Sequence, residues 1–390
     1  MIYKLRDYQQ KASDAAVSFF ANKAKKNNVI MVLPTGAGKS LVIADIASRL
    51  EGHTLVFQPS REIVEQNYLK LCSYGILDCS IYSASFGRKD ISRITFATIG
   101  SVINHPEFFQ HFKNIIIDEC HLVNPKEGMY KSFLSMLKCK VLGLTATPYR
   151  LSSSKEFGSE LKFITRTRPR VFSEVIYQVQ ISTLLDMGYL SKLNYYPMNP
   201  MGWNELNLKV NTTGADYTDK SVVKEYERID FYGFLVHIVQ RLMNPKSGIK
   251  RKGILVFTRF LKEAERLTWS IPGTAIVSGD TPKKERERIL EAFKAGEIPV
   301  VANVGVLTTG FDYPELDTIV MARPTMSLAL WYQIVGRAIR PHPSKEAGWV
   351  VDLCGNIKRF GEVKDLRLED GGNGKWAVYS KDRQLTNVRF

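Results

Sequence analysis

The 390-residue sequence has few cysteines and no long hydrophobic run, and each absence excludes a class of protein. Its five cysteines, at positions 72, 79, 120, 139 and 354, form no C-x-x-C pair, so we predict neither a disulfide framework nor a zinc or iron–sulfur site. No apolar run reaches the roughly 18 residues that span a bilayer, and the opening MIYKLRDYQQ has neither an apolar h-region nor a cleavage site. We therefore expect a cytoplasmic protein without a membrane partner.

The sequence is strongly basic, with a formal charge of +15 at pH 7. A polyanion is the commonest partner of a protein this basic, although a merely basic surface is the alternative. The positive excess is spread along the chain, with its largest share in residues 1–150. This distribution favours a groove across several domains over a single basic tail, and the length predicts two to three domains.

A phosphate-binding loop is predicted at VLPTGAGKS, from Val32 to Ser40, between a short apolar strand and a helix. Gly36 and Gly38 let backbone N–H groups turn toward an anion. Lys39 can reach the β- and γ-phosphates of a nucleotide, and the Ser40 hydroxyl can bind Mg²⁺. Leu33 replaces the first glycine of the strict motif, and Thr35 belongs to the resulting P-T-G-x-G-K-S variant.

The residues upstream of this loop could frame an adenine. An arginine face can stack on the base and a glutamine amide can bond its edge, which makes Arg6 and Gln9 candidates for nucleotide binding. They lie about thirty residues before the loop, on the segment that leads into a predicted helix.

Short apolar strands alternate with helical patterns through the first part of the chain, which predicts a parallel sheet with helices on both faces. One strand, His53–Gln58, leads into Ser60 and Arg61, and another, Arg93–Thr98, leads into Ser101. Donors at a helix start can hold a phosphate, so Ser60, Arg61, Thr98 and Ser101 are candidate nucleic-acid contacts. A solvated helix start is nearly as good an interpretation of Arg61.

Two carboxylates follow a strand of three isoleucines in IIIDECH, residues 115–121. Ligands of such sheets bind at the carboxyl ends of the strands. We assign Asp118 to Mg²⁺ and Glu119 to the attacking water. His121 is a candidate for coupling the nucleotide site to a second domain, with a capping or core histidine as the alternative.

The strand Val141–Leu144 runs into Thr145 and Thr147, whose hydroxyls can sense whether the γ-phosphate is present. Pro148 stops the element, so we place the first domain boundary near residue 150.

In this order and spacing, LRDYQQ, LPTGAGKS, DECH and TAT resemble the first motor domain of superfamily 2 helicases and translocases. The family implies a matching second domain, and strands are predicted at Ile254–Thr258, Ala275–Ser278, Val300–Val304 and Thr318–Met321. The string GVLTTGFDYPELD resembles motif V of the family. That resemblance implies nucleic-acid contacts from Thr308, Thr309 and Gly310, and a ribose contact from Asp312.

The predicted helix containing QIVGRAIR, residues 333–340, matches the Q-x-x-G-R-x-x-R motif of the family at Gln333, Gly336, Arg337 and Arg340. Arginines three residues apart share a helix face, so Arg337 and Arg340 can point at one target. We expect that target to be the γ-phosphate held by the first domain, with Gln333 also binding the nucleotide.

The resemblance implies an α/β fold of two RecA-like domains, each a mainly parallel sheet with helices on both faces. The predicted divisions are 1–150 (ATP-binding domain), 151–250 (partly helical middle segment), 251–356 (helicase C-terminal domain) and 357–390 (tail or small hairpin). We further predict a helical run from Lys220 to Met243, a cap at Thr281 with Pro282 at the first helical position, and an edge strand or hairpin over Val378–Val388. Trp203 is one aromatic candidate for a nucleic-acid contact.

Further strings, SGDTPKKER and VLTTGFD among them, resemble the RadD type of bacterial DNA-repair helicase, a DECH-box protein. That resemblance implies a cytoplasmic, monomeric DNA helicase or translocase that uses ATP and Mg²⁺ on single-stranded or forked DNA. Single-strand-binding or other replication and repair proteins are the expected partners. The alternatives are an RNA helicase and a nucleic-acid clamp that uses ATP only as a conformational switch.

Overall fold

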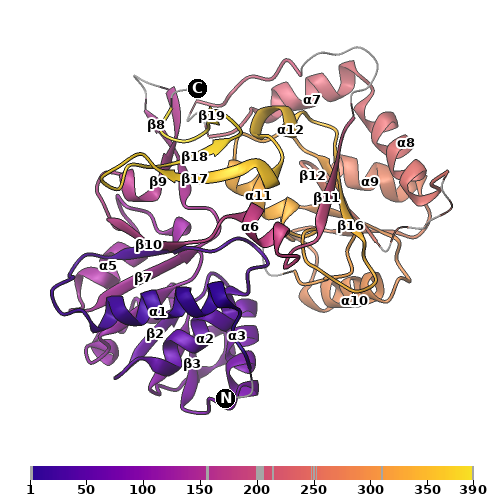
Figure 1. The fold of residues 1–390 in the computed structure, drawn as a ribbon. Helices are drawn as coiled ribbons and strands as arrows, with labels where there is room; N and C mark the ends of the chain where they lie inside the picture. The colour runs from indigo at the N-terminus through magenta and orange to yellow at the C-terminus, as the bar shows by residue number, and fades with distance from the viewer. Residues whose placement is uncertain are drawn as a thin grey trace. The chain divides into compact units, whose positions relative to one another are not determined.

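The computed structural model describes residues 3–154, 158–198, 206–212, 215–246, 248, 251, 253–308 and 311–388. By its internal contacts the chain divides into two compact units (Figure 1). Unit 1 comprises residues 1–150, 161–181 and 368–378, and unit 2 comprises residues 151–160, 182–367 and 379–390. The candidates Trp203, Thr309 and Gly310 lie outside the described residues.

An eight-stranded sheet forms the centre of unit 1. Its strands are β1 (Val29–Val32), β2 (Thr54–Phe57), β3 (Cys79–Ser83), β4 (Arg88–Lys89), β5 (Ile94–Ala97), β6 (Asn114–Ile117), β7 (Lys140–Thr145) and β10 (Glu174–Gln178). They lie in the order β10-β1-β7-β6-β2-β5-β3-β4, and every neighbouring pair is parallel except β3 with β4. The short apolar runs β1, β2, β5 and β6 are buried throughout, as strands covered on both faces must be.

The helices of unit 1 follow the strands. They are α1 (Asp7–Ala21), α2 (Lys39–Arg49), α3 (Arg61–Ser73), α4 (Ile99–Val102) and α5 (Met129–Ser135), with the 3₁₀ turns η1 (Ala84–Phe86), η2 (Pro106–Phe109), η3 (Cys120–Leu122) and η4 (Ile164–Arg166). Helix α2 packs against both α1 and α3, beside the first strands of the sheet (Figure 1). This arrangement places the starts of α2 and α3 directly after the carboxyl ends of β1 and β2.

Unit 2 is built on a second, fully parallel sheet. Its strands are β11 (Lys192–Pro197), β12 (Ile254–Thr258), β13 (Thr274–Val277), β14 (Val300–Val304), β15 (Thr318–Ala322) and β16 (Ala347–Asp352). Their order is β11-β16-β15-β12-β14-β13. Strands β13 and β14 lie to one side of β12, and β15 and β16 to the other, so the strand order reverses between β12 and β15. The two mainly parallel sheets confirm the predicted fold class.

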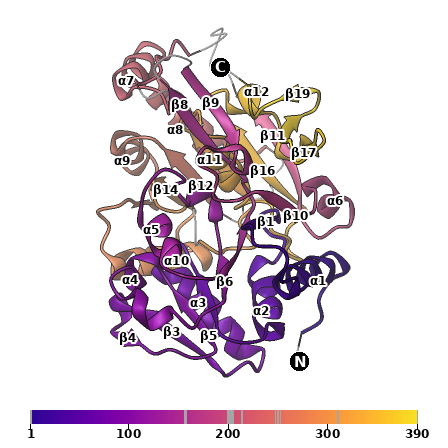
Figure 2. The ribbon, with the colours of Figure 1, turned by 90° about the vertical axis from the view of Figure 1, so that its left-hand side faces the viewer.

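The helices of unit 2 are α6 (Ile181–Asp186), α7 (Asp219–Arg228), α8 (Phe231–Met243), α9 (Leu261–Ser270), α10 (Lys283–Lys294), α11 (Leu328–Val335) and α12 (Asn356–Phe360), with the 3₁₀ turn η5 (Val363–Asp365). Helices α8 and α9 lie beside β12 (Figure 2). In the core beneath them the rings of Tyr226 and Phe231 stack with centroids 3.9 Å apart. The Tyr226 hydroxyl donates to the Ala322 carbonyl at 2.9 Å, which satisfies its buried polar atom.

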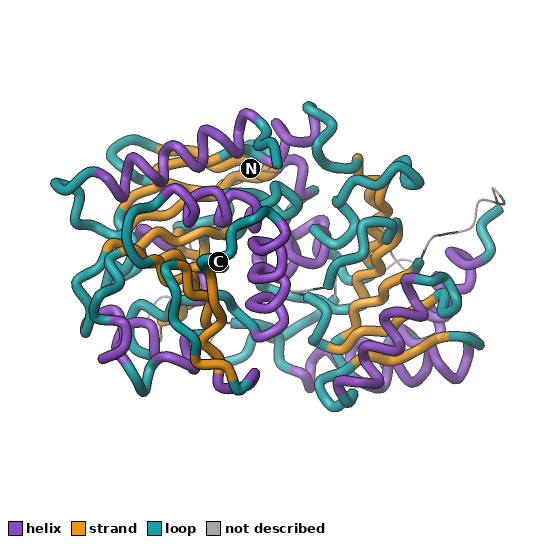
Figure 3. Tube along the Cα trace, turned by 90° about the horizontal axis from the view of Figure 1, so that it is seen from below, coloured by secondary structure: helices purple, strands orange, loops and turns teal. Residues whose placement is uncertain are grey.

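Two small sheets complete the described structure. Figure 3 shows the helices and strands of the described residues along the Cα trace. One pairs β8 (Tyr149–Ser154) with β9 (Gly158–Phe163), and the other has the order β17 (Leu366–Asp370), β18 (Trp376–Ser380), β19 (Arg383–Gln384). Strands β18 and β19 are antiparallel, with Tyr379 opposite Gln384, so the hairpin alternative for the end of the chain is the one found. None of the helices in the described ranges is long and apolar enough to cross a membrane.

Two helix predictions are wrong in their boundaries. The run predicted from Lys220 to Met243 is two helices, because Asp230 has a left-handed backbone (φ 47°) and its carboxylate accepts the Gly233 N–H at 3.3 Å, which caps α8. The predicted cap at Thr281 is also wrong. Pro282 itself precedes the first helical residue of α10, and the Thr281 hydroxyl instead accepts the Ser278 N–H at 2.9 Å.

The third correction concerns the QIVGRAIR segment. Helix α11 ends at Val335, and the chain continues in turns at Gly336 and Arg337. The Arg337 N–H donates to the Ile334 carbonyl at 3.0 Å. Arg337 and Arg340 therefore lie beyond the helix and do not share a helix face. The apolar pattern extends the predicted helix too far because Ala338 and Ile339 are fully buried, as residues of a continuing helix would be.

Candidate nucleotide site

The VLPTGAGKS loop joins the carboxyl end of β1 to the start of α2. Gly36 and Gly38 are exposed and have left-handed backbones, with φ of 83° and 76°. A side chain disfavours this conformation, which explains the glycines at these positions. Leu33 is fully buried, and its N–H donates to the Thr145 carbonyl of β7 at 3.0 Å. The residue that departs from the strict motif thus fixes the loop to the sheet, and the helix start offers backbone donors to an anion.

Helix α1 holds this loop from the other side. The Tyr8 hydroxyl and the Gln9 amide both donate to the Ala37 carbonyl, at 2.8 and 2.9 Å, and the Gln9 oxygen accepts the Arg6 N–H at 3.0 Å. A Cβ added at Gly38 would lie 2.5 Å from the Gln9 nitrogen. Gln9 is therefore packed against the loop backbone, and adenine binding by Arg6 and Gln9 stays a prediction.

Lys39 and Glu119 form an ion pair at the carboxyl ends of the strands. Asp118 and Glu119 follow β6, and the Lys39 nitrogen lies 2.5 Å from a Glu119 oxygen. The Glu119 N–H donates to the Asp118 carboxylate at 2.9 Å. Glu119 has a left-handed backbone (φ 49°), a conformation that costs a non-glycine residue about 1–2 kcal/mol. Such strain is concentrated at functional sites, where the surroundings hold it in place.

His121, predicted to couple the nucleotide site to a second domain, lies beside this pair together with Thr145 and Thr147, the predicted γ-phosphate sensors. The Nδ1 atom of His121 is 2.9 Å from the Thr145 hydroxyl, 3.1 Å from the Thr147 hydroxyl and 3.3 Å from a Glu119 oxygen. The Thr147 N–H also donates to the Thr145 hydroxyl at 3.0 Å. His121 is 8% exposed and both threonines are fully buried. A continuous polar chain thus runs from Lys39 through Glu119 to the end of β7.

Burial and charge separate the two neighbouring carboxylates. Burial raises the pKa of Asp118 to about 6, against the opposing influence of Lys39. Burial would raise the pKa of Glu119 as well, but the charge of Lys39 and the contact with His121 outweigh it and hold this pKa well below its ordinary value. Burial would lower the pKa of Lys39, yet Glu119 and Asp118 keep it above the ordinary value. Glu119 is therefore the firmly ionised carboxylate of the two.

The residues present fit a Mg²⁺ ion bound together with a nucleotide. Ser40 and Asp118 follow β1 and β6, which flank β7, so both oxygen donors lie at the same edge of the sheet. Oxygen is the ligand that Mg²⁺ prefers, and nucleotide-bound Mg²⁺ commonly uses one or two protein ligands plus phosphates. Within the described ranges no cluster of three or more His, Cys, Asp or Glu side chains is placed to hold a metal.

The nucleic-acid candidates of unit 1 also share one edge of the sheet, because they follow the adjacent parallel strands β2 and β5. The Ser60 hydroxyl caps α3 by accepting the Ile63 N–H at 3.4 Å, and the Arg61 guanidinium lies 4.0 Å from the centre of the Phe86 ring. The hydroxyls of Thr98 and Ser101 lie 3.0 Å apart. Their contact with a nucleic acid stays a prediction.

In unit 2 both candidate arginines bind neighbours within the unit. Arg337 is 8% exposed, and its guanidinium donates to the Phe311 carbonyl at 2.7 Å and the Gln333 carbonyl at 3.3 Å. Arg340 forms an ion pair with Asp312, the residue predicted to bind the ribose. Burial lowers the pKa of Arg340. Arg337 thus supports the segment that carries Asp312, whereas Arg340 contacts Asp312 directly.

Sequence reasoning missed a residue that shapes the loop before Thr308. The fully buried carboxamide of Asn303 accepts the N–H groups of Val306 at 3.2 Å and Leu307 at 2.9 Å. A polar residue inside the buried strand β14 was the available signal.

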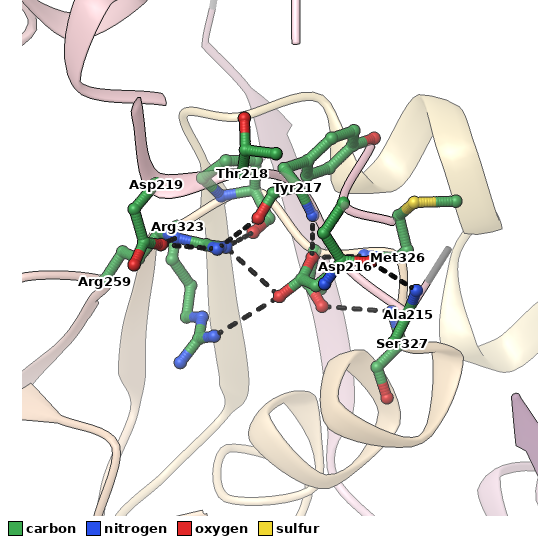
Figure 4. Close-up of polar contacts among 12 residues, drawn as sticks. Ala215, Asp216, Tyr217, Thr218, Asp219, Arg259, Arg323, Met326 and Ser327 are labelled. Atoms are coloured by element: carbon green, nitrogen blue, oxygen red, sulfur yellow. Dashed lines mark hydrogen bonds and ion pairs between the residues drawn. The ribbon is translucent and has the colours of Figure 1, made fainter. Parts of the chain in front are cut away.

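A second missed feature is the ion cluster that fixes the loop before α7 to the strand ends of unit 2 (Figure 4). Arg259 follows β12 and Arg323 follows β15, at the point where the strand order reverses. One Asp216 oxygen lies 3.1 Å from Arg259 and 3.8 Å from Arg323, and the other accepts the Met326 N–H at 3.2 Å. Arg259 also pairs with Asp219 at 2.8 Å. No motif in residues 206–219 signals this arrangement.

Two protein families match the chain, one in each half. The family "Type III restriction enzyme, res subunit" matches residues 2–150, and "Helicase conserved C-terminal domain" matches residues 235–342. An ATP-dependent helicase, IRC3, of Saccharomyces cerevisiae is 25% identical over 391 residues, covering 90% of this chain and 51% of the relative. The DNA 3'-5' translocase XPB2 of Sulfurisphaera tokodaii is 27% identical, and the match covers 86% of this chain and 79% of the relative's length.

Solved structures share the fold. The Type ISP restriction–modification enzyme LlaBIII bound to DNA superposes with a TM-score of 0.67 at 19% identity, covering 90% of this chain and 28% of the enzyme. An HsdR fragment of a type I restriction enzyme from Vibrio vulnificus YJ016 superposes with a TM-score of 0.65 at 21% identity. The match covers 92% of this chain and 65% of the fragment. The chain spans 51% of the IRC3 relative's length. Each half of the chain is thus similar to a known helicase or restriction-enzyme domain, and the solved structures share a fold of two RecA-like domains.

Proposed function

We propose that this chain, which carries the two motor domains of a superfamily 2 helicase, hydrolyses ATP to move along or unwind DNA. The observation that carries the proposal is the polar chain from Lys39 through Glu119 and His121 to Thr145 and Thr147. Loss of a γ-phosphate beside Lys39 alters the partners of Glu119, and the buried histidine transmits that change to the end of β7. A protein that only binds nucleotide has no need of this connection.

Each residue of the site has a proposed part in the reaction. Gly36, Gly38 and Thr35 surround the phosphates, and Ser40 and Asp118 hold Mg²⁺. When bound, the metal neutralises charge on the β- and γ-phosphates. Lys39 moves from Glu119 to the γ-phosphate, which leaves the Glu119 carboxylate able to orient a water molecule. The 2.5 Å ion pair is therefore the resting state of two groups that separate when ATP binds.

The two arginines of unit 2 have different proposed roles. Arg340 leaves Asp312 to stabilise the charge that develops on the γ-phosphate, and Asp312 is then able to bind the ribose, with Gln333 as a further nucleotide ligand. Arg337 acts mainly by holding the Phe311 carbonyl. Changing Arg340 to alanine leaves ATP binding largely intact and slows hydrolysis by about 10³-fold or more, as expected for an arginine finger. An unaltered hydrolysis rate removes Arg340 from this role, and Arg266→Ala, a change of an exposed arginine on α9, is the matched control.

The nucleic-acid contacts proposed at Ser60, Arg61, Thr98, Ser101, Thr308 and Thr309 address the phosphate backbone. Binding through such contacts depends little on sequence and weakens as salt rises. The relative XPB2, named as a DNA 3'-5' translocase, favours DNA as the polymer. We further propose a cytoplasmic monomer of the RadD type, with DECH as its metal-binding motif, acting in DNA repair beside single-strand-binding or other replication proteins.

ATP turnover measured with no polymer, single-stranded DNA, forked DNA and RNA tests the proposal. DNA should stimulate turnover, and stimulation by RNA to at least the same level would instead support an RNA helicase. Tight ATP binding without turnover under all four conditions would support an ATP-switched clamp. Lys39→Ala should abolish turnover, and full activity in that variant contradicts the site.

A further inference from the structure

A cavity of about 320 Å³ opens in unit 2, away from the residues assigned to ATP. Its floor consists of side chains from β11 and β16, and its wall consists of the last turns of α8 and the segment that follows. The lining includes Tyr196, Trp349, Arg241, Lys246 and Arg251. This volume lies at the lower end of the range for ligand pockets, about 300–1,000 Å³, so the cavity has room for one small planar group.

Planar groups stack at the floor of the cavity. The rings of Tyr196 and Trp349 lie 4.5 Å apart with an angle of 21° between their planes. The Arg251 guanidinium lies 3.4 Å from the centre of the Trp349 ring. All three side chains are partly exposed, and all three line the cavity, where a further flat ring could reach the stack. An aromatic base would extend it, as bases stack on aromatic side chains in known single-strand complexes.

The charges around the stack have one sign. Arg241 and Lys246 are exposed, Arg251 lies beside them, and no acidic side chain lines the cavity among the described residues. The described part of the chain shows no ion pair for any of these three cations. The Nε–H of Arg251 is buried and has no hydrogen-bond partner among the described residues, which is unusual for a buried donor. A phosphate at this position would neutralise the cations and pair with a donor.

The alternative explanation is that Tyr196 and Trp349 only complete the edge of the core. Tyr196 does pack against the core, with Met198 and Leu242 beside it. Packing alone, however, does not explain why three cations that have no acidic partner in the described ranges surround a partly exposed aromatic stack. Ordinary surfaces intersperse charges of both signs.

We propose that this cavity binds one nucleotide of a single DNA strand, with its base on the Tyr196–Trp349 stack and its phosphate against Arg241, Lys246 and Arg251. The proposal rests on the proposed function, because it assigns a further contact for the same polymer. It adds a position on unit 2 where the strand is held by base stacking as well as by its backbone. A free nucleoside monophosphate has the same chemistry, and the experiment separates the two sources.

An oligonucleotide with 2-aminopurine in place of one base tests the stack, because stacking quenches its fluorescence. The wild-type protein should quench at least one label position, and Trp349→Leu should abolish that quenching and weaken strand affinity at least about five-fold. Arg241→Gln should weaken affinity and lower the slope of log K against log salt by about 0.7. Trp269→Leu and Arg266→Gln are matched controls, since both residues are exposed on α9 and line no part of the cavity, and neither should change binding.

Three results would overturn the proposal. If the wild-type protein binds DNA and the variants Trp349→Leu and Arg241→Gln bind it equally well, the cavity is not a DNA-binding site. The proposed function is then left standing. If added dTMP abolishes the quenching while the labelled strand stays bound, the cavity binds a free nucleotide and not the strand. A strand carrying 5-iodouracil that crosslinks elsewhere and never to Tyr196 or Trp349 also refutes the stack, and this measurement needs no variant to fold. Wild-type protein that neither binds DNA nor responds to it contradicts the proposed function itself.

Discussion

Replacing the adjacent carboxylates Asp118 and Glu119 by their amides should change the stability of the protein in opposite directions. Burial raises the pKa of Asp118 to about 6 from an ordinary value near 4. Each pKa unit corresponds to about 1.4 kcal/mol, so the ionised Asp118 destabilises the folded state by up to about 3 kcal/mol above pH 6. This penalty develops as the pH rises from about 4 to about 6 and is absent below that window.

Asp118→Asn removes that charge and keeps an oxygen to accept the Glu119 N–H. We therefore expect this variant to be more stable than the wild type at pH 7.5, by about 1–3 kcal/mol, and to lose the advantage near pH 4. Glu119→Gln leaves the buried Lys39 without its main partner, and a hydrogen bond to a charged group contributes about 1.5–3 kcal/mol. The pKa of Glu119 is lowered, so its contribution to stability is present at neutral pH and is lost only in acid.

Urea unfolding followed by tryptophan fluorescence at pH 7.5 and pH 4 measures both effects, with ATP turnover recorded in parallel at pH 7.5. Both variants should be inactive, so activity alone does not distinguish them. If Asp118→Asn is less stable than the wild type at pH 7.5, or if the two amides shift the unfolding midpoint in the same direction, the electrostatic argument is refuted.

Three other predictions follow from contacts described above. His121→Ala should leave ATP binding intact but reduce the stimulation of ATP turnover by DNA, and unchanged stimulation would remove the histidine from the coupling role. Asp216→Ala removes a partly buried carboxylate shared by two arginines and should destabilise unit 2 by about 1–3 kcal/mol. Asp219→Ala, at a 72% exposed side chain, should change stability by less than about 1 kcal/mol in the same urea titration. Gly38→Ala should weaken ATP binding in a fluorescent-nucleotide titration, because its methyl group meets Gln9 and its φ is 76°; wild-type affinity would contradict the rigid loop.

The sequence predicted well the features that depend on local pattern. The buried strands were located to within one or two residues, because runs such as Ile115–Ile117 are apolar on both faces and end at polar residues. The fold class followed from the alternation of such strands with helices. The close grouping of Lys39, Glu119 and His121 also followed, since the carboxyl ends of neighbouring parallel strands meet at one edge.

Features that depend on distant contacts were not predictable in the same way. Helix α11 ends at Val335, although Ala338 and Ile339 beyond it are fully buried, so the apolar pattern continues past the end of the helix. Asp216 is an ordinary loop residue until the fold brings it to Arg259 and Arg323, 43 and 107 positions later in the chain. Such partners have no local signal, so their assignment needed the structure.

The pairing of β10 with β1 bears on how the ATP-binding half can be produced alone. Residues Val29–Val32 are fully interior because β10, Glu174–Gln178, covers their outer side. A gene truncated after residue 150 would remove β10 and turn this apolar segment into an open sheet edge, a template for association with other chains. Insolubility of that fragment would result from the loss of β10, which begins about 25 residues downstream of the cut. Sequence motifs alone would not show that the fragment needs this strand.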